Sequence, residues 1–213
     1  MKALLDGIGA VLFDLDGTLV DSMTGFGLVA ARVLEQHHGL PFAQGQEAYR
    51  RTSGIPFFAQ LEQLFPGDPR NPAAATQFEA EKLHGMFEDP LNPGCLETLE
   101  GLRGRRLFTA LSSNNFQDVV DRFVAARALP LDLVLAWRSP EFCKGPAHFA
   151  EVLRLTGLRN DALLFVGDSL ADGQKAAQAG LRFAGLQGTF TKAEFQAALG
   201  PVPVLGKLMD LLN

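Results

Sequence analysis

Short apolar runs that end in polar residues recur along this chain and alternate with segments of helical periodicity. The first run is Val11-Leu12-Phe13, and similar runs predict strands at residues 107–111, 133–136, 162–166 and 182–186. Helical spacing predicts helices at residues 95–103, 116–126, 146–156 and 170–179, with one or two more closing the chain. This alternation predicts a parallel sheet with helices on both faces.

Residues 21–89 differ, because apolar residues there recur only at helical spacing and no strand is predicted. The expected helices are one that ends near Gly39, one around residues 47–52, one after Pro56 and one from Asn71 to about residue 87. Asn71 is expected to cap the last of these, with Pro72 in its first position. The whole segment is therefore predicted to be helical.

Together these patterns predict an α/β protein with a Rossmann-like core and an inserted helical cap. The core is expected to comprise residues 1–20 and 90–213, and the cap residues 21–89. An insertion at the carboxyl end of the first strand can act as a lid that excludes water and selects substrates.

The amino-acid composition narrows the range of possible functions. The chain has 213 residues, of which 47% are hydrophobic and 20% charged, as in an ordinary globular protein. Its net charge of −5 and lack of a lysine and arginine run argue against a nucleic acid polymer as partner. The two cysteines, Cys95 and Cys143, suit a reducing compartment. With no signal peptide and no apolar run that could span a bilayer, we expect a cytoplasmic protein without a membrane partner.

The strongest chemical signal is Asp14-Leu15-Asp16-Gly17-Thr18, directly after the first apolar run. Open α/β sheets bind ligands at the carboxyl ends of their strands. Two carboxylates so close together repel each other, unless a cation neutralises them or one holds a proton. Magnesium prefers such oxygen ligands. The alternative is an acidic turn, because Asp-Gly is an ordinary turn dipeptide.

Two further strand ends carry polar residues. Ser112, Ser113 and Asn114 follow the second strand and can bind an anion through a hydroxyl and backbone N–H groups, or can simply cap the next helix. Lys144 follows the third strand and precedes a predicted helix start, where the positive helix end disfavours a lysine. The alternative for Lys144 is a solvated surface residue.

The fourth strand ends in Gly167-Asp168-Ser169, and Asp172 lies one helical turn later. Asp168 or Ser169 can alternatively cap the following helix. Four strand ends with acids, hydroxyls and a lysine are hard to explain as four independent caps. Together they predict a metal, an anion and a neutralising cation in one crevice.

This set of residues resembles the four motifs of the haloacid dehalogenase superfamily: Asp14-Leu15-Asp16-Gly17-Thr18, Ser112, Lys144 and Gly167-Asp168-Ser169-x-x-Asp172. It is most similar to the phosphatase branch with a helical cap after the first strand, the phosphoglycolate phosphatase and β-phosphoglucomutase group. The resemblance covers essentially the whole chain. Asp16 favours phosphoryl chemistry, because true dehalogenases lack an acid there. In one departure, Lys144 is followed by Gly145-Pro146-Ala147-His148, where relatives commonly have Pro-x-Pro-Asp.

The resemblance implies a role for each position. Asp14 would be the nucleophile that forms an aspartyl-phosphate, and Asp16 the general acid–base. Mg2+ would bind the Asp14 side chain, the Asp16 backbone carbonyl and Asp168, with Asp172 supporting these ligands. The remaining implied roles are phosphoryl binding by Ser112, Ser113, Asn114 and Lys144, and neutralisation of Asp14 by Lys144.

The function that follows is a magnesium-dependent phosphomonoesterase for a small soluble organic phosphate. The alternatives are a phosphosugar mutase that uses the same intermediate and a phosphate-binding module without turnover. Arg50 and Arg51 lie in the cap, where one of them can contact a distal anionic group of the substrate or both can be solvated. A monomer is the default expectation.

Overall fold

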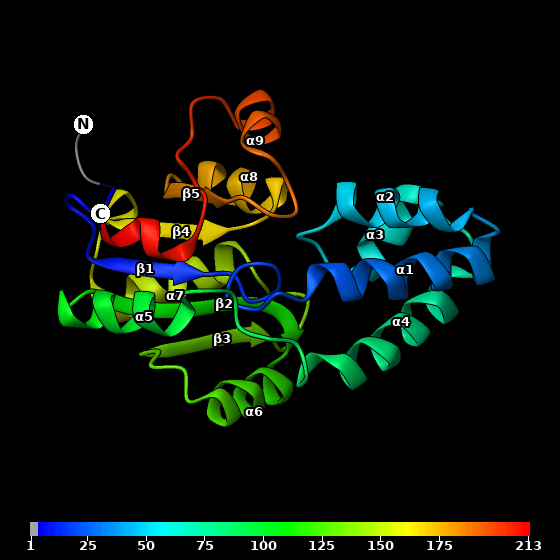
Figure 1. Ribbon diagram of the computed structural model, residues 1–213, viewed down its shortest axis with the longest axis horizontal. Coiled ribbons are helices and arrows are strands. Elements are labelled where there is room, and N and C mark those ends of the chain that lie inside the picture. The colour runs from blue at the N-terminus through cyan, green and yellow to red at the C-terminus, as the bar shows by residue number, and fades with distance from the viewer. Residues whose placement is uncertain (1–3) are drawn as a thin grey trace. The chain divides into compact units, whose positions relative to one another are not determined.

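A computed structural model describes residues 4–213, except for the side chains of residues 84 and 86 (Figure 1). Its centre is a six-stranded sheet with the order β3-β2-β1-β4-β5-β6, in which every neighbouring pair is parallel. The strands are β1 (Ala10–Phe13), β2 (Phe108–Phe116), β3 (Leu133–Trp137), β4 (Leu163–Gly167), β5 (Arg182–Leu186) and β6 (Val204–Leu205). The predicted α/β, Rossmann-like fold is confirmed.

Helices lie on both faces of this sheet, and α5 is on the opposite face from α7 (Figure 1). The helices are α5 (Cys95–Gly104), α6 (Gln117–Arg127), α7 (Pro146–Thr156), α8 (Leu170–Gln178) and α9 (Lys192–Leu199), with short 3-10 turns η1 (Asn160–Ala162) and η2 (Leu208–Leu212). One face of the central strands packs on α7 and α8 through the apolar side chains Leu12, Ala110, Phe149, Phe165 and Ala176. This core fixes the positions of the strand ends.

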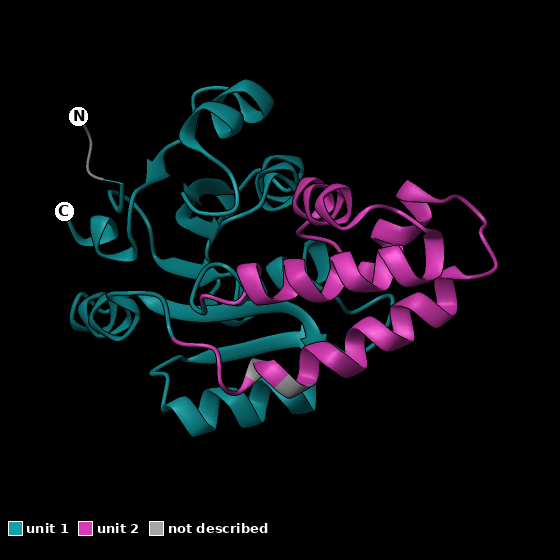
Figure 2. Ribbon diagram, turned by 45° about the vertical axis from the view of Figure 1, so that its right-hand side comes forward, with its two compact units in different colours: residues 1–20, 91–213 teal, residues 21–90 magenta. Residues whose placement is uncertain are grey.

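The chain divides into two compact units, residues 1–20 with 91–213 and residues 21–90 (Figure 2). The second unit contains α1 (Met23–His38), α2 (Phe42–Thr52), α3 (Phe57–Leu64) and α4 (Asn71–Met86). Its core is rich in aromatic side chains, among them Phe26, Tyr49, Phe57 and Phe78. The backbone of residues 21–90 is described throughout, and none of it forms a strand.

The chain leaves and re-enters the first unit at neighbouring backbone positions. Val20 and Leu91 form an antiparallel bridge. The Asn92 side chain donates hydrogen bonds to the backbone carbonyls of Gly17 and Thr18, at 3.2 and 2.8 Å. These bonds fix the loop that follows Asp14 and Asp16.

Three local expectations from the sequence differ from the structure. Strand β2 continues to Phe116, with a register shift between Ser112 and Phe116, so the serines lie within the strand. The short edge strand β6 was not predicted, because two residues carry too little periodicity. Asn71 is not the cap of α4: Arg70 holds that position, and the buried Asn71 amide instead donates to Glu62 and to the Phe65 carbonyl.

Candidate active site

Strand register brings the polar segments to one edge of the sheet. Phe13 pairs with Leu111 on one side and with Val166 on the other. The next residues along these strands are Asp14, Ser112 and Gly167-Asp168, so they meet where β1 and β4 end, beside the part of β2 in which the register shifts. The site thus lies at the carboxyl edge of a parallel sheet, where such sheets bind ligands.

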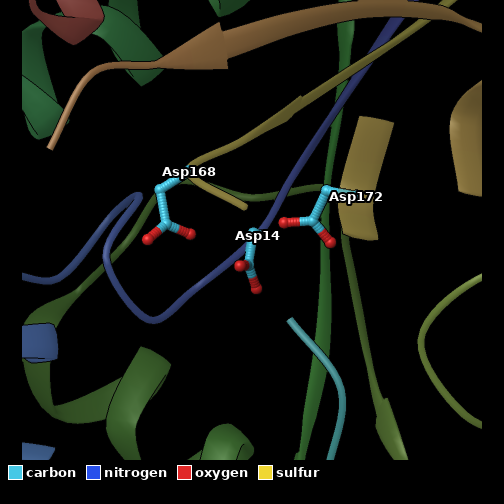
Figure 3. Close-up of side chains that lie close together, drawn as sticks. All are labelled: Asp14, Asp168 and Asp172. Carbon is cyan, nitrogen blue, oxygen red and sulfur yellow. The ribbon is translucent and has the colours of Figure 1, made fainter. Parts of the chain in front are cut away.

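Three carboxylates gather at this edge. Asp14 follows β1, Asp168 follows β4, and Asp172 lies in the first turn of α8 (Figure 3). One oxygen of each lies within 4.8 Å of the others, and all three residues are at most 5% exposed. Because mutual repulsion and burial both disfavour three bare carboxylates, this arrangement needs positive charge.

Lys144 supplies part of that charge. It lies just before α7 and is itself buried, and its Nζ is 2.7 Å from Asp14 Oδ2 and 2.8 Å from Asp172 Oδ1. Burial alone would lower the pKa of Lys144, but the two carboxylates outweigh burial and raise it, so the ammonium group keeps its charge. Lys144 thus lies within ion-pair distance of Asp14, and its role in the reaction stays a prediction from the resemblance.

The pKa values of the acids show that one ammonium group is not enough. Burial, together with Asp172 and Asp168, raises the pKa of Asp14 well above its usual value despite the attraction of Lys144. Burial and the Asp172 charge raise the pKa of Asp168 to about 7. Without a further cation the protein would have to hold protons at these carboxyl groups.

Both oxygens of Asp172 are engaged by side chains, whereas Asp14 pairs through Oδ2 with Lys144 and accepts at Oδ1 from the Leu15 backbone N–H at 2.7 Å. Asp172 Oδ1 pairs with Lys144, and Asp172 Oδ2 accepts a 2.7 Å hydrogen bond from the Ser169 hydroxyl. Ser169 is also the N-cap of α8, because its Oγ accepts from the Asp172 backbone N–H. The capping alternative is therefore correct for Ser169, and Asp168 is left to face Asp14.

Asp16 is half-buried, and Asn115 donates a 2.8 Å hydrogen bond from its Nδ2 to Asp16 Oδ2. Ser112 and Ser113 are buried, whereas Asn114 is half-buried. The Ser112 hydroxyl lies 2.8 Å from His148 Nδ1, and the Ser113 Oγ accepts from the Asn115 backbone N–H. Hydrogen bonds to α7 and within the segment thus order the irregular part of β2.

Sequence reasoning missed several side chains at this edge. The Thr189 hydroxyl donates to Asp168 Oδ2, and Lys175 lies on α8 beyond Asp172. Burial, followed by repulsion from Lys144, lowers the pKa of Lys175 to about 8. Thr189 and Lys175 are in no motif that points to chemistry. The repeated Asn114-Asn115 after a strand was a usable signal for Asn115.

Arg50 and Arg51 belong to the second unit, at the end of α2. The Arg50 guanidinium forms a 2.8 Å ion pair with Glu47, and Arg51 is exposed. Their assignment to substrate selection stays a prediction from the sequence.

Comparison with known proteins gives the family. Residues 11–186 match the model of the haloacid dehalogenase-like hydrolases. The chain belongs to this family. A phosphoglycolate phosphatase from Photorhabdus laumondii is 30% identical over 99% of this chain and 93% of its own length. Phosphoglycolate phosphatase 1 from Pseudomonas aeruginosa is 29% identical, over 95% and 78%. The protein is accordingly a phosphatase-type haloacid dehalogenase-like hydrolase, as the motifs predicted.

Solved structures share the fold. A haloacid dehalogenase-like family hydrolase from Streptococcus pneumoniae superposes with a TM-score of 0.79 at 19% identity, covering 97% of this chain and 98% of its own. A hydrolase from Pseudomonas syringae gives a TM-score of 0.80 at 22% identity, covering 96% of both chains. No helix within residues 4–213 combines the length and hydrophobicity needed to cross a lipid bilayer.

Proposed function

We propose that this hydrolase is a magnesium-dependent phosphomonoesterase that acts on small organic phosphates through an aspartyl-phosphate at Asp14. The observation that carries the proposal is the buried group of Asp14, Asp168 and Asp172 around Lys144 at the edge of the sheet. It combines a nucleophile, anionic ligands for a cation and a fixed positive charge within the length of a side chain.

The donor set suits a divalent cation, and Mg2+ in particular. Every acidic donor is a carboxylate oxygen, which hard cations prefer. Asp14 and Asp168 would hold the ion, with the backbone carbonyl of Asp16, and the raised pKa of Asp168 indicates unmet negative charge at this point. Asp172 would support the site, because it pairs with Lys144 and accepts a hydrogen bond from Ser169. When bound, the ion supplies charge neutralisation for the nucleophile and the phosphoryl oxygens.

The first chemical step belongs to Asp14 and Asp16. A carboxylate oxygen of Asp14 attacks phosphorus, forming an O–P bond while the bond between phosphorus and the ester oxygen breaks. The protonated Asp16 carboxyl group gives its proton to the departing alkoxide, which leaves as an alcohol. Lys144 stays charged throughout and offsets the negative charge of the Asp14 carboxylate and the incoming phosphoryl group.

The second step regenerates the enzyme. The Asp16 carboxylate, held by Asn115, accepts a proton from water as the water oxygen attacks phosphorus. The bond between phosphorus and Asp14 breaks, and inorganic phosphate is released. The hydroxyl and N–H groups of Ser112, Ser113 and Asn114 would bind the phosphoryl oxygens in both steps.

Phosphoglycolate is the first substrate to test, because two of the most similar relatives are phosphoglycolate phosphatases. Sugar phosphates and nucleotides belong to the same panel. The experiment measures inorganic phosphate released by the pure protein from each ester, with Mg2+ and with EDTA. We expect Mg2+-dependent release, and a fall of roughly a thousandfold or more for Asp14→Asn.

Two other results would redirect the proposal. Conversion of a labelled hexose 1-phosphate into another hexose phosphate, without phosphate release, would identify a phosphosugar mutase. No release from any ester, together with retained phosphate binding, would identify a binding module. Full activity of Asp14→Asn would remove the nucleophile on which the mechanism depends.

A further inference from the structure

A buried histidine outside the proposed catalytic set contacts the phosphoryl-binding serine. His148 lies in the first turn of α7, four residues after Lys144, and its Nδ1 is 2.8 Å from the Ser112 hydroxyl oxygen. Both residues have 0% exposure. Because polar groups this deeply buried are costly unless they are paired, the contact is a specific feature of the site and not an incidental surface bond.

The register of the sheet shows why this contact matters. Leu12 of β1 pairs with Ala110 of β2, and both side chains pack in the cluster that includes Phe149 and Val152 of α7. Side chains two residues apart on a strand share a face. Asp14 and Ser112 are each two residues further on, so they stand next to each other on the face that α7 covers.

The His148 ring contributes a hydrogen bond and no charge. Burial lowers its pKa to about 4, an effect that the Ala136 backbone carbonyl offsets only in part. The ring also lies against Phe142, with ring centroids 4.9 Å apart. A neutral imidazole can donate or accept at Nδ1, so it can hold the serine oxygen in either tautomer.

We propose that His148 is a positioning residue for the phosphatase reaction, which fixes the Ser112 hydroxyl in the one rotamer that faces the phosphoryl group bound beside Asp14. A serine hydroxyl otherwise divides its population among three staggered positions. Holding it before substrate arrives removes an ordering cost from the reaction. The proposal rests on the function proposed above, because it assigns Ser112 to the phosphoryl group.

Substitutions at residue 148 separate the hydrogen bond from the ring. His148→Asn keeps a polar group at the position of Nδ1, whereas His148→Gln moves it to the position of Nε2, and His148→Leu removes it. We expect kcat/KM to fall about three- to tenfold in the Leu and Gln variants, the range for one lost hydrogen bond. The Asn variant should stay within about twofold of the wild type.

Inhibition by orthovanadate gives a readout that a purely structural role would not move. This ion mimics the five-coordinate phosphoryl group, so its inhibition constant should rise by the same factor as kcat/KM falls. The midpoint of thermal unfolding, followed by circular dichroism, measures any loss of stability separately from the kinetic effect. A Leu variant with a lowered midpoint but an unchanged vanadate constant would show that His148 only stabilises the protein, and would overturn the proposal.

A double-mutant cycle tests whether His148 acts through Ser112. His148→Leu should lower kcat/KM in the wild type but change it less than about twofold in a Ser112→Ala background. An equal fall in both backgrounds, or rescue by Gln as good as rescue by Asn, would contradict the proposal. Absence of Mg2+-dependent phosphate release by the wild-type protein would instead refute the proposed function itself, so the two failures are distinguishable.

Discussion

Asp16 differs in its surroundings from the other acids of the proposed site. It is half-buried, whereas Asp14 and Asp168 are buried, and it accepts a hydrogen bond from the neutral amide of Asn115. The proposed acid–base role requires a carboxyl group that can reach both substrate and water, and partial exposure is consistent with that role.

Asp16→Asn should therefore suppress turnover more than phosphoryl transfer. We expect steady-state kcat to fall by roughly a hundredfold to ten-thousandfold, the usual range for loss of a general acid–base. With p-nitrophenyl phosphate, whose leaving group needs no proton, the variant should still release a burst of about one nitrophenolate per protein. Stopped-flow absorbance measures both the nitrophenolate burst and the steady-state kcat.

The exposed carboxylate Asp161, on η1, offers a matched control. Asp161→Asn removes the same charge at a distant surface and should leave kcat unchanged. Wild-type turnover of Asp16→Asn would place the acid–base function on another residue.

The residues at the strand ends could be predicted from the sequence. The side chains from other parts of the chain that form hydrogen bonds in the site could not. Apolar runs locate strand ends, so Asp14 and Asp168 followed from local pattern, and Lys144 from the predicted start of the next helix. The bond between Asn115 and Asp16 joins residues 99 positions apart, and that between Ser112 and His148 joins residues 36 apart. Such contacts depend on sheet order and side-chain direction, which the local sequence does not encode.

At the scale of elements, the turn from β4 into α8 holds Lys144 and Asp172 in place. Gly167 is the last residue of β4, and a Cβ atom there would lie 2.5 Å from Asp172 Oδ2. Real Cβ atoms do not approach so closely, so any larger residue must displace the Asp172 carboxylate. That displacement would in turn break the ion pair with Lys144.

Gly167→Ala is expected to lower both activity and stability. Breaking a buried ion pair typically costs about 3–5 kcal/mol, and overpacking about 1–3 kcal/mol, so the free energy of unfolding should fall by several kcal/mol. Urea unfolding and phosphate release measure the two effects.

Gly188 provides the matched control. A Cβ atom there meets nothing within 4 Å, and the residue is exposed with an ordinary φ. Gly188→Ala should change the free energy of unfolding by less than about 0.5 kcal/mol. Equal stability of the Gly167 and Gly188 variants would show that Asp172 can move freely.

Element boundaries were predictable where the chain carries its own stop signals. Gly39 ends α1 in a left-handed conformation, and helix 146–156 and strand 182–186 have the predicted bounds. The prediction failed at Asn71, whose side chain is turned inward to Glu62 and Phe65 by packing within the helical unit. Tertiary contacts there override a local capping preference.

At the scale of the whole molecule, the buried acids link folding to pH and metal. The pKa of Asp168 is about 7 in the folded protein and near 4 in an unfolded chain. Between these values the metal-free folded state holds a proton that the unfolded state has lost. The stability contributed by this proton is therefore complete below pH about 4 and is lost as pH rises through about 7.

Mg2+ should restore that stability, and more so at higher pH, because it binds the deprotonated carboxylates. We expect the rise in melting temperature from EDTA to Mg2+ to be larger near pH 7.5 than near pH 5. At a Mg2+ concentration about 100 times its Kd, binding contributes about 2.7 kcal/mol, or a shift of several degrees.

The difference between the melting temperatures in Mg2+ and in EDTA at each pH excludes the contribution of groups that titrate independently of the metal. His148 is one of these: burial depresses its pKa, so its contribution has the opposite sign and is lost as pH falls from about 6.5 toward about 4. Asp168→Asn should abolish most of the Mg2+-dependent shift. An equal shift at both pH values would mean that the carboxylates do not release protons on binding.

The bridge between Val20 and Leu91 has a consequence for how such enzymes diversify. The chain leaves the sheet unit and returns to it at neighbouring backbone positions. The sheet therefore does not fix the length or composition of the inserted segment, residues 21–90. Recombination at these two points can replace the inserted segment with another while the sheet and its helices stay intact. Such an exchange would replace only the helical unit, which one contiguous stretch of gene encodes.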